Sequence, residues 1–184
     1  MSNPSLVIVL VEDERHRMLI RRYLIECKLK EHAIRIHQSP SGRGSAEAWV
    51  LKEFVRETDA CRNRQKRART ALVVMIDADN HTVPDRFNQL DQVLREQGKP
   101  TVGEGEGIAR LVPRRNVETW ILCLNNEQDV DEDTDYKRQR RTWHQLIPPA
   151  AEMLCHWTQP NAQPPDRCVD SLRIGVRELK PLRS

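Results

Sequence analysis

Two short apolar runs, each followed at once by acidic side chains, constrain the fold of this chain more than any other feature. Leu6–Val11 precedes Glu12, and Ala71–Ile76 precedes Asp77 and Asp79. Uninterrupted runs rich in valine, isoleucine and leucine are typical of strands buried on both faces, as in a parallel sheet that helices cover. Ligands of such sheets gather at the carboxyl ends of the strands. The sequence therefore predicts an α/β protein with acidic residues at its ligand-binding edge.

Segments with helical spacing separate the apolar runs. In these segments apolar residues recur on one face of a helix. The predicted elements, from the amino end, are strand Leu6–Val11, helix Arg15–Leu29, strand Ala33–His37, helix Ala46–Thr58, basic linker Cys61–Thr70, strand Ala71–Ile76, helix Pro84–Gln97, strand Ile108–Val112, helix Pro113–Leu124, helix Trp143–Trp157 interrupted at Pro148 and Pro149, and helix Asp170–Leu182. This alternation predicts a mostly parallel central sheet with helices on both faces.

The chain has the length of one domain. At 184 residues it can bury roughly two-thirds of the surface that its unfolded form exposes. The composition changes after residue 124, where an acidic run leads into a basic one. We therefore expect residues 1–124 to form the α/β core. Residues 125–184 are expected to form a charged linker and a short helical C-terminal extension packed on that core.

Composition and cysteine usage exclude several classes of protein. Charged residues make up 31% of the chain and hydrophobic residues 38%, and the hydrophobic residues are clustered in runs, which argues against disorder. The cysteines form no C-x-x-C pair, so the pattern favours neither a disulfide framework nor a zinc ribbon. No apolar run approaches the roughly 20 residues that a membrane span requires. We expect a cytoplasmic protein without a membrane segment. The sequence does not indicate an oligomeric state.

The acidic residues predict a divalent metal. If the first and third strands are neighbours, Glu12 lies beside Asp77 and Asp79. Carboxylates that converge in this way repel one another unless a cation lies between them, and oxygen ligands suit Mg²⁺ or Mn²⁺. Side chains alternate along an extended segment, so the D-x-D spacing should point both aspartates the same way. We predict a metal centre at Glu12, Asp77 and Asp79.

The same residues resemble those of the Toprim superfamily, which includes type IA topoisomerases, primases and overcoming-lysogenization-defect nucleases. The resemblance rests on LVIVLVE, which ends at Glu12, and on LVVMIDAD, which contains Asp77 and Asp79, and it covers about residues 6–124. It implies a Toprim-like fold and a Mg²⁺-dependent nuclease in which Glu12 acts as general acid or base and the two aspartates hold the metal. Toprim proteins usually have glycine where this chain has Asp13.

A later segment, VPRRNVETWIL, resembles one found in stand-alone Toprim-like proteins of bacterial defence systems. In those proteins a glutamate opens a helix near the acidic site, which makes Glu118 a further candidate ligand of the metal or of water. The alternative for Glu118 is a first-turn acid stabilised by the helix dipole. Together the resemblances imply a phosphodiesterase that acts on DNA or RNA as an anti-phage effector.

Basic segments are candidates for contact with a nucleic acid. The loop SPSGRGS places glycines and Arg43 after the second strand, where they could hold a phosphate, although the loop does not match the P-loop pattern. A plain turn is the alternative there. Other basic side chains could neutralise backbone phosphates or form only a solvated linker. These are Arg62, Arg64, Lys66, Arg67 and Arg69, followed later by Lys137, Arg138, Arg140 and Arg141.

Two other classes of function stay open. The opening VIVLVEDERHRMLIRRYL also resembles a response-regulator receiver, in which paired acids bind Mg²⁺ beside a phosphorylated aspartate. Against a receiver, Asp77 lies too far along the chain and no hydrophobic-Lys-Pro sequence follows a later strand. A Toprim-like fold could also be a non-catalytic subunit that works with an ATPase of the ABC or AAA type. Failure to bind a metal would favour this second class.

Overall fold

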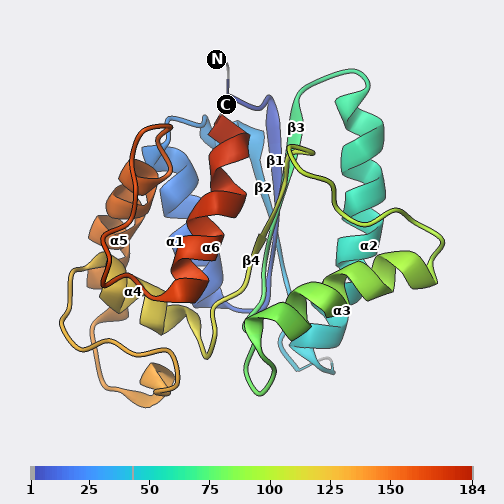
Figure 1. The fold of residues 1–184 in the computed structure, drawn as a ribbon. Coiled ribbons are helices and arrows are strands. Elements are labelled where there is room, and N and C mark those ends of the chain that lie inside the picture. Colours follow the sequence, from blue (N-terminus) through green and yellow to red (C-terminus); the bar gives the residue numbers. More distant parts are fainter. Residues whose placement is uncertain (1–2, 43, 184) are drawn as a thin grey trace.

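The computed structural model of the protein describes residues 3–42 and 44–183, in which four strands form one parallel sheet (Figure 1). The strand order is β2-β1-β3-β4. β1 and β3 pair along their whole length, with Val11 opposite Met75. The first and third strands are thus neighbours, which meets the condition on which the predicted proximity of Glu12 and Asp77 depends, and their carboxyl ends lie level. The strands are β1 (Leu6–Val11), β2 (Ile34–Gln38), β3 (Thr70–Met75) and β4 (Ile108–Leu111).

Helices cover both faces of the sheet, as Figure 1 shows. One face carries α1 (Glu14–Glu26), α4 (Val117–Leu124), α5 (Trp143–Trp157) and α6 (Asp170–Leu179). The opposite face carries α2 (Ala46–Gln65) and α3 (Val83–Glu96). Short 3₁₀ turns lie at Glu31–Ala33, Tyr136–Arg138 and Lys180–Arg183. The prediction of an α/β fold with a parallel sheet and helices on both faces is confirmed.

The strands supply side chains to two separate buried layers. In β1, Val7 and Val9 belong to the layer shared with α1, whereas Ile8 and Leu10 belong to the layer shared with α2. Burial of each such side chain contributes about 1.5–3 kcal/mol relative to exposure. This two-sided burial explains why the strand sequences are continuously apolar, and why polar residues begin where the strands end.

Helix α2 is longer than the sequence predicts. It continues to Gln65, so the expectation of a basic linker over Cys61–Thr70 is wrong for the first part of that segment. The physical reason is that Phe54 and Cys61 both lie on the buried face of one helix, and the side chain of Cys61 is fully buried. Arg62 and Arg64 therefore belong to a helix that packing holds in place, whereas Lys66 and Arg67 follow its end.

Helix α5 runs through Pro148 and Pro149 without the expected interruption. The two prolines leave the carbonyls of His144 and Gln145 without a helical donor, but both of these residues are exposed and water can serve them. The opposite face of α5, including Ile147, is buried against the core. Burial of that face outweighs the missing hydrogen bonds.

The C-terminal extension shares the core of the sheet. Helix α6 crosses Trp120 of α4, whose indole Nε1 donates a 2.7 Å hydrogen bond to Ser171 Oγ. A Cβ atom on Gly175 would lie 2.3 Å from the ring of Trp120, so only glycine allows this approach. Within residues 3–42 and 44–183, no helix is long and apolar enough to cross a membrane.

Candidate metal centre

Glu12 and Asp77 meet at the carboxyl ends of β1 and β3. The backbone N–H of Asp77 donates a 2.8 Å hydrogen bond to Glu12 Oε2. Asp77 itself is only 4% exposed. The register of β1 and β3 therefore holds the Glu12 carboxylate against the backbone of Asp77, which is the proximity that the sequence predicts.

His16 completes a group that the sequence reasoning missed. This side chain is fully buried, and its Nε2 lies 3.0 Å from Asp77 Oδ1. Its backbone is held by the N-cap of α1, because the Asp13 carboxylate accepts hydrogen bonds from the N–H groups of Arg15 and His16. Glu12, His16 and Asp77 each offer a ligand atom, and these atoms lie within 4.8 Å of one another. The signal in the sequence is the spacing of Glu12 and His16, four positions apart across a capped helix start.

Burial and neighbouring charges shift the protonation of this group. Burial raises the pKa of Glu12 to about 7, against the lowering effect of His16. Burial alone would lower the pKa of His16, but the charge and hydrogen bond of Asp77, with the charges of Asp13 and Glu12, raise it to about 9. Near neutral pH, His16 is thus a cation among carboxylates, and Glu12 can both take up and release a proton.

Asp79 departs from the predicted geometry. Its φ of +53° takes the chain out of the extended conformation, so the alternation expected to align it with Asp77 ends before it. Asp79 is exposed and lies outside the metal-capable group found among the described residues. Asp79 still interacts electrostatically with that group, because burial and then the charge of Asp77 raise its pKa. Arg114 holds the turn by donating to the carbonyl oxygens of Asp79 and His81, at 3.1 and 2.9 Å.

Glu118 lies in the first turn of α4 and is 1% exposed. It forms an ion pair with Arg15, and burial raises the pKa of its carboxyl group. Lys137 approaches the same region from the 3₁₀ turn, with Nζ 3.3 Å from Asp13 Oδ2. Burial opposes the charge on Lys137, but Asp13 and Asp77 outweigh it and raise its pKa. Glu118 and Lys137, both sequence candidates, therefore border the acidic group.

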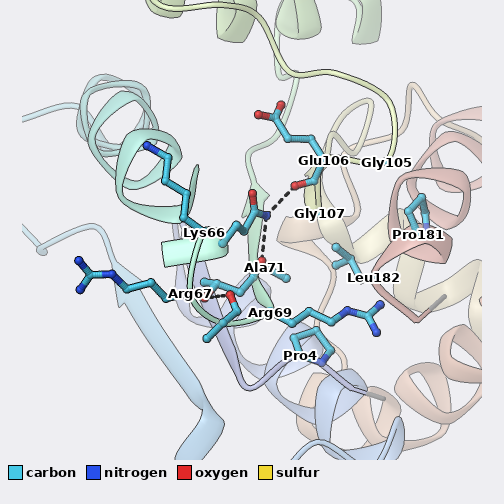
Figure 2. A pocket seen from close by; sticks show the side chains of 13 residues that line it. Pro4, Lys66, Arg67, Arg69, Ala71, Gly105, Glu106, Gly107, Pro181 and Leu182 are labelled. Carbon is cyan, nitrogen blue, oxygen red and sulfur yellow. Dashed lines mark hydrogen bonds between the residues drawn. The ribbon is translucent and has the colours of Figure 1, made fainter. Parts of the chain in front are cut away.

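Two of the basic candidates lie at the opposite edge of the sheet. Lys66 and Arg67 line a cavity of about 540 Å³ at the amino end of β3. Six residues of strand, about 20 Å at 3.3 Å per residue, separate this end from Asp77. In Figure 2 the side chains of Lys66, Arg67 and Arg69 extend in different directions instead of converging on one point.

The remaining members of that set have structural partners. Arg62 is paired with Glu106 and donates to the carbonyl oxygens of Pro100 and Thr101. Arg64 lies 3.4 Å from the buried Glu57. Arg43, the candidate phosphate contact, lies outside the described residues. Contact of these basic residues with a nucleic acid stays a prediction, and the structure places Lys66 and Arg67 at the end of β3 opposite to the acidic edge.

A second group with metal-ligating atoms lies at His37, Glu53 and Glu57, where β2 meets α2. Arg56 forms ion pairs with both glutamates, and Arg64 forms another with Glu57. Arginine cations already neutralise these carboxylates. This group is an ion-pair network of α2.

Comparisons with protein-family models, with curated proteins and with solved structures find no match to this chain. The proposed function therefore rests on the chemistry of the acidic edge.

Proposed function

We propose that this chain is a cytoplasmic, Mg²⁺- or Mn²⁺-dependent phosphodiesterase that acts on DNA or RNA as an effector of anti-phage defence. The observation that carries the proposal is the fixed contact of Glu12 with the backbone of Asp77 at adjacent strand ends. The resemblance of the two strand ends to those of Toprim nucleases supports the same reading. Buried, mutually close carboxylates at this edge are a typical place for a hard cation.

The residues present fit a divalent metal. Carboxylate oxygens suit Mg²⁺ and Mn²⁺, and we assign them first to Glu12 and Asp77, which lie in the close group. Glu118 is proposed as a further ligand of metal or water, and Asp79, which lies outside that group, would have to turn toward the ion to bind it. Arg15, His16 and Lys137 lie among the carboxylates of Glu12, Asp13, Asp77 and Glu118, and the charges of Lys137, Arg86 and Arg115 act on Asp79. A bound divalent ion would neutralise charge on a scissile phosphate and lower the pKa of a bound water.

The side chains themselves have distinct roles in this proposal. Glu12 acts as general acid or base, because its pKa of about 7 lets it exchange a proton near neutral pH. His16 orients Asp77 through the hydrogen bond from its Nε2. Lys137, at the border of the group, offers a positive charge to the phosphate backbone. The basic residues at the amino edge of the sheet would contact a nucleic acid only outside this centre.

A second candidate function follows from the charge on His16. This buried cation offsets part of the carboxylate charge without a metal, as expected of a centre that has only a structural role. The protein would then be a non-catalytic Toprim-like subunit of a complex with an ATPase of the ABC or AAA type. The two candidates differ in metal-dependent cleavage.

A cleavage assay tests the first candidate. Purified protein is incubated with plasmid DNA and with total tRNA in the presence of Mg²⁺ or Mn²⁺, beside the variants Glu12→Gln and Asp77→Asn. We expect metal-dependent cleavage in the wild type and a loss of at least about a hundredfold in either variant, because Glu12→Gln removes the proton-transfer group and Asp77→Asn removes a ligand of the metal. The matched control is Glu152→Gln, which removes an exposed carboxylate of α5 and should cleave normally. Cleavage retained by Glu12→Gln or Asp77→Asn would contradict the assignment.

A further inference from the structure

Two buried cysteines lie in contact where α1 and α5 end. Cys27 is the C-cap of α1, and its thiol donates a hydrogen bond to Sγ of Cys155 in the last turn of α5, with 2.8 Å between the sulfur atoms. Cys27 is 4% exposed and Cys155 is 8% exposed. The two residues are 128 positions apart in the sequence. Only the fold therefore brings these two thiols together.

The pair joins the α/β core to the C-terminal extension. Helix α1 belongs to the core and α5 to the extension, and the two helices lie side by side (Figure 1). At their starts the Arg15 guanidinium lies over the ring of Trp143, 5.5 Å from its centroid. The thirteen residues of α1, about 20 Å at 1.5 Å per residue, separate that contact from the cysteines. A covalent bond between the sulfur atoms would thus fasten the extension to the core far from the acidic edge.

We propose that Cys27 and Cys155 are a redox site, which forms a reversible disulfide between the core and the extension on oxidation by a peroxide. The sulfur atoms need to approach by only about 0.8 Å to reach the length of a disulfide bond, about 2.0 Å. The bond would close a loop that includes most of the chain, and it would stabilise the fold by restricting the unfolded chain. In a reducing compartment such a bond is transient, as expected of a response to oxidation.

The reaction balances with hydrogen peroxide as the oxidant. The thiolate of Cys155, which accepts the hydrogen bond from Cys27, attacks one oxygen of the peroxide, and the O–O bond breaks to release hydroxide and leave a sulfenic acid. Sγ of Cys27 then attacks the sulfur of Cys155, and the sulfenic oxygen leaves with the proton of the Cys27 thiol as water. Two thiols and one peroxide give one disulfide and two waters. Two molecules of a thiol reductant, which become a disulfide themselves, restore both cysteines.

The other cysteines allow this site to be distinguished from a general sensitivity to oxidation. Cys61 lies in the opposite buried layer, and burial raises the pKa of its thiol to about 11, so that its reactive thiolate is scarce near neutral pH. Cys123 and Cys168 form a second pair, in which the hydrogen bond from Cys168 lowers the pKa of Cys123 to about 7. That pair is a competing target for peroxide, and mapping of the linked peptides separates the two.

Peptide mapping under non-reducing conditions tests the site directly. The folded, full-length protein is treated with hydrogen peroxide, the remaining thiols are alkylated, and the digest is analysed by mass spectrometry before and after reduction. We expect a peptide that joins Cys27 to Cys155 and that disappears on reduction with dithiothreitol. The Tm of the oxidised protein should exceed that of the reduced protein by about 5–15 °C, and dithiothreitol should reverse the rise.

Cys155→Ala is the test variant and Cys61→Ala is the matched control, because both remove a buried thiol but only the first removes a partner of the bond. Cys155→Ala should lack the linked peptide, and Cys61→Ala should form it like the wild type. The digest of the wild type decides even where a variant fails to fold. Separately alkylated Cys27 and Cys155 after peroxide treatment, or a link between Cys123 and Cys168 alone, would overturn the proposal.

Discussion

At the level of single residues, the sequence predicted the acidic residues of the site but not His16. The acidic strand ends were predictable because a parallel sheet places them at one edge. His16 was not, because a single histidine has no partner histidine at metal-ligand spacing, and only the fold brings it to Asp77. Asp13 caps the start of α1, and this cap holds the backbone of His16.

Loss of His16 should destabilise the protein strongly. The variant His16→Gln removes a buried cation and leaves Asp77 unpaired in the interior. We expect the free energy of unfolding to fall by about 3–5 kcal/mol, as for one broken partner of a buried ion pair. Urea denaturation measures the change. The control is His156→Gln, which replaces an exposed histidine of α5 and should stay within about 0.5 kcal/mol of the wild type; equal stability of both variants would refute the buried pair.

The lowered pKa of Glu47 predicts how the stability of the fold depends on pH under acidic conditions. The guanidinium of Arg86, which is 1% exposed, and then the amide of Gln89 hold the pKa of Glu47 below its ordinary value of 4.5. Because the folded-state pKa is the lower one, this carboxylate stabilises the fold above the ordinary pKa, and that stabilisation is lost as pH falls through the folded-state pKa.

Unfolding measured in acid tests this dependence. The stability of Glu47→Gln should fall less steeply below about pH 4.5 than that of the wild type. Glu152→Gln removes a carboxylate that is exposed on α5, and it should retain the wild-type slope. Identical acid slopes for Glu47→Gln and the wild type would show that the contact with Arg86 has no linkage to folding.

At the scale of elements, hydrophobic periodicity predicted which segments form helices and strands, but not where they end. Charge alone suggested a linker after Thr58, while the buried Cys61 keeps α2 helical to Gln65. Proline alone suggested a break in α5, while tertiary packing keeps it continuous. In both helices long-range burial outweighs a local signal, and a single sequence does not reveal which neighbour will supply that burial.

The contact of α6 with α4 gives a prediction at this scale. Alanine usually stabilises a helix relative to glycine, by about 1 kcal/mol. In Gly175→Ala the added methyl group would overlap the ring of Trp120, so we expect a loss of about 1–3 kcal/mol instead. Thermal or urea unfolding measures it. Arg177→Ala, on the exposed side of α6, is the control and should change stability little; a stabilised Gly175→Ala would contradict the close packing of the two helices.

In the whole molecule, polar residues gather at both ends of the strands of the sheet, and the length of the strands keeps the two groups apart. The carboxyl edge gathers the acidic group, with Arg15 and Lys137 beside it, and the amino edge carries Lys66 and Arg67. The parallel topology was predictable from the sequence, whereas the adjacency of β1 and β3, which places Glu12 beside Asp77, was only a condition of the prediction and is supplied by the structure. The separation of the basic segment from the acidic edge was not predictable, because a charge run has no periodicity that assigns it to one end of a strand.

The acidic edge is proposed to hold a divalent metal, and calorimetric titration of Mg²⁺ and Mn²⁺ measures that binding. The titration compares the wild type with Asp77→Asn and with the exposed control Glu152→Gln, each checked for folding by circular dichroism. We predict saturable binding by the wild type and by Glu152→Gln, and loss of that binding in folded Asp77→Asn. Absence of binding in the wild type, or equal binding in folded Asp77→Asn, would contradict the account and leave the charge on His16 with a purely structural role.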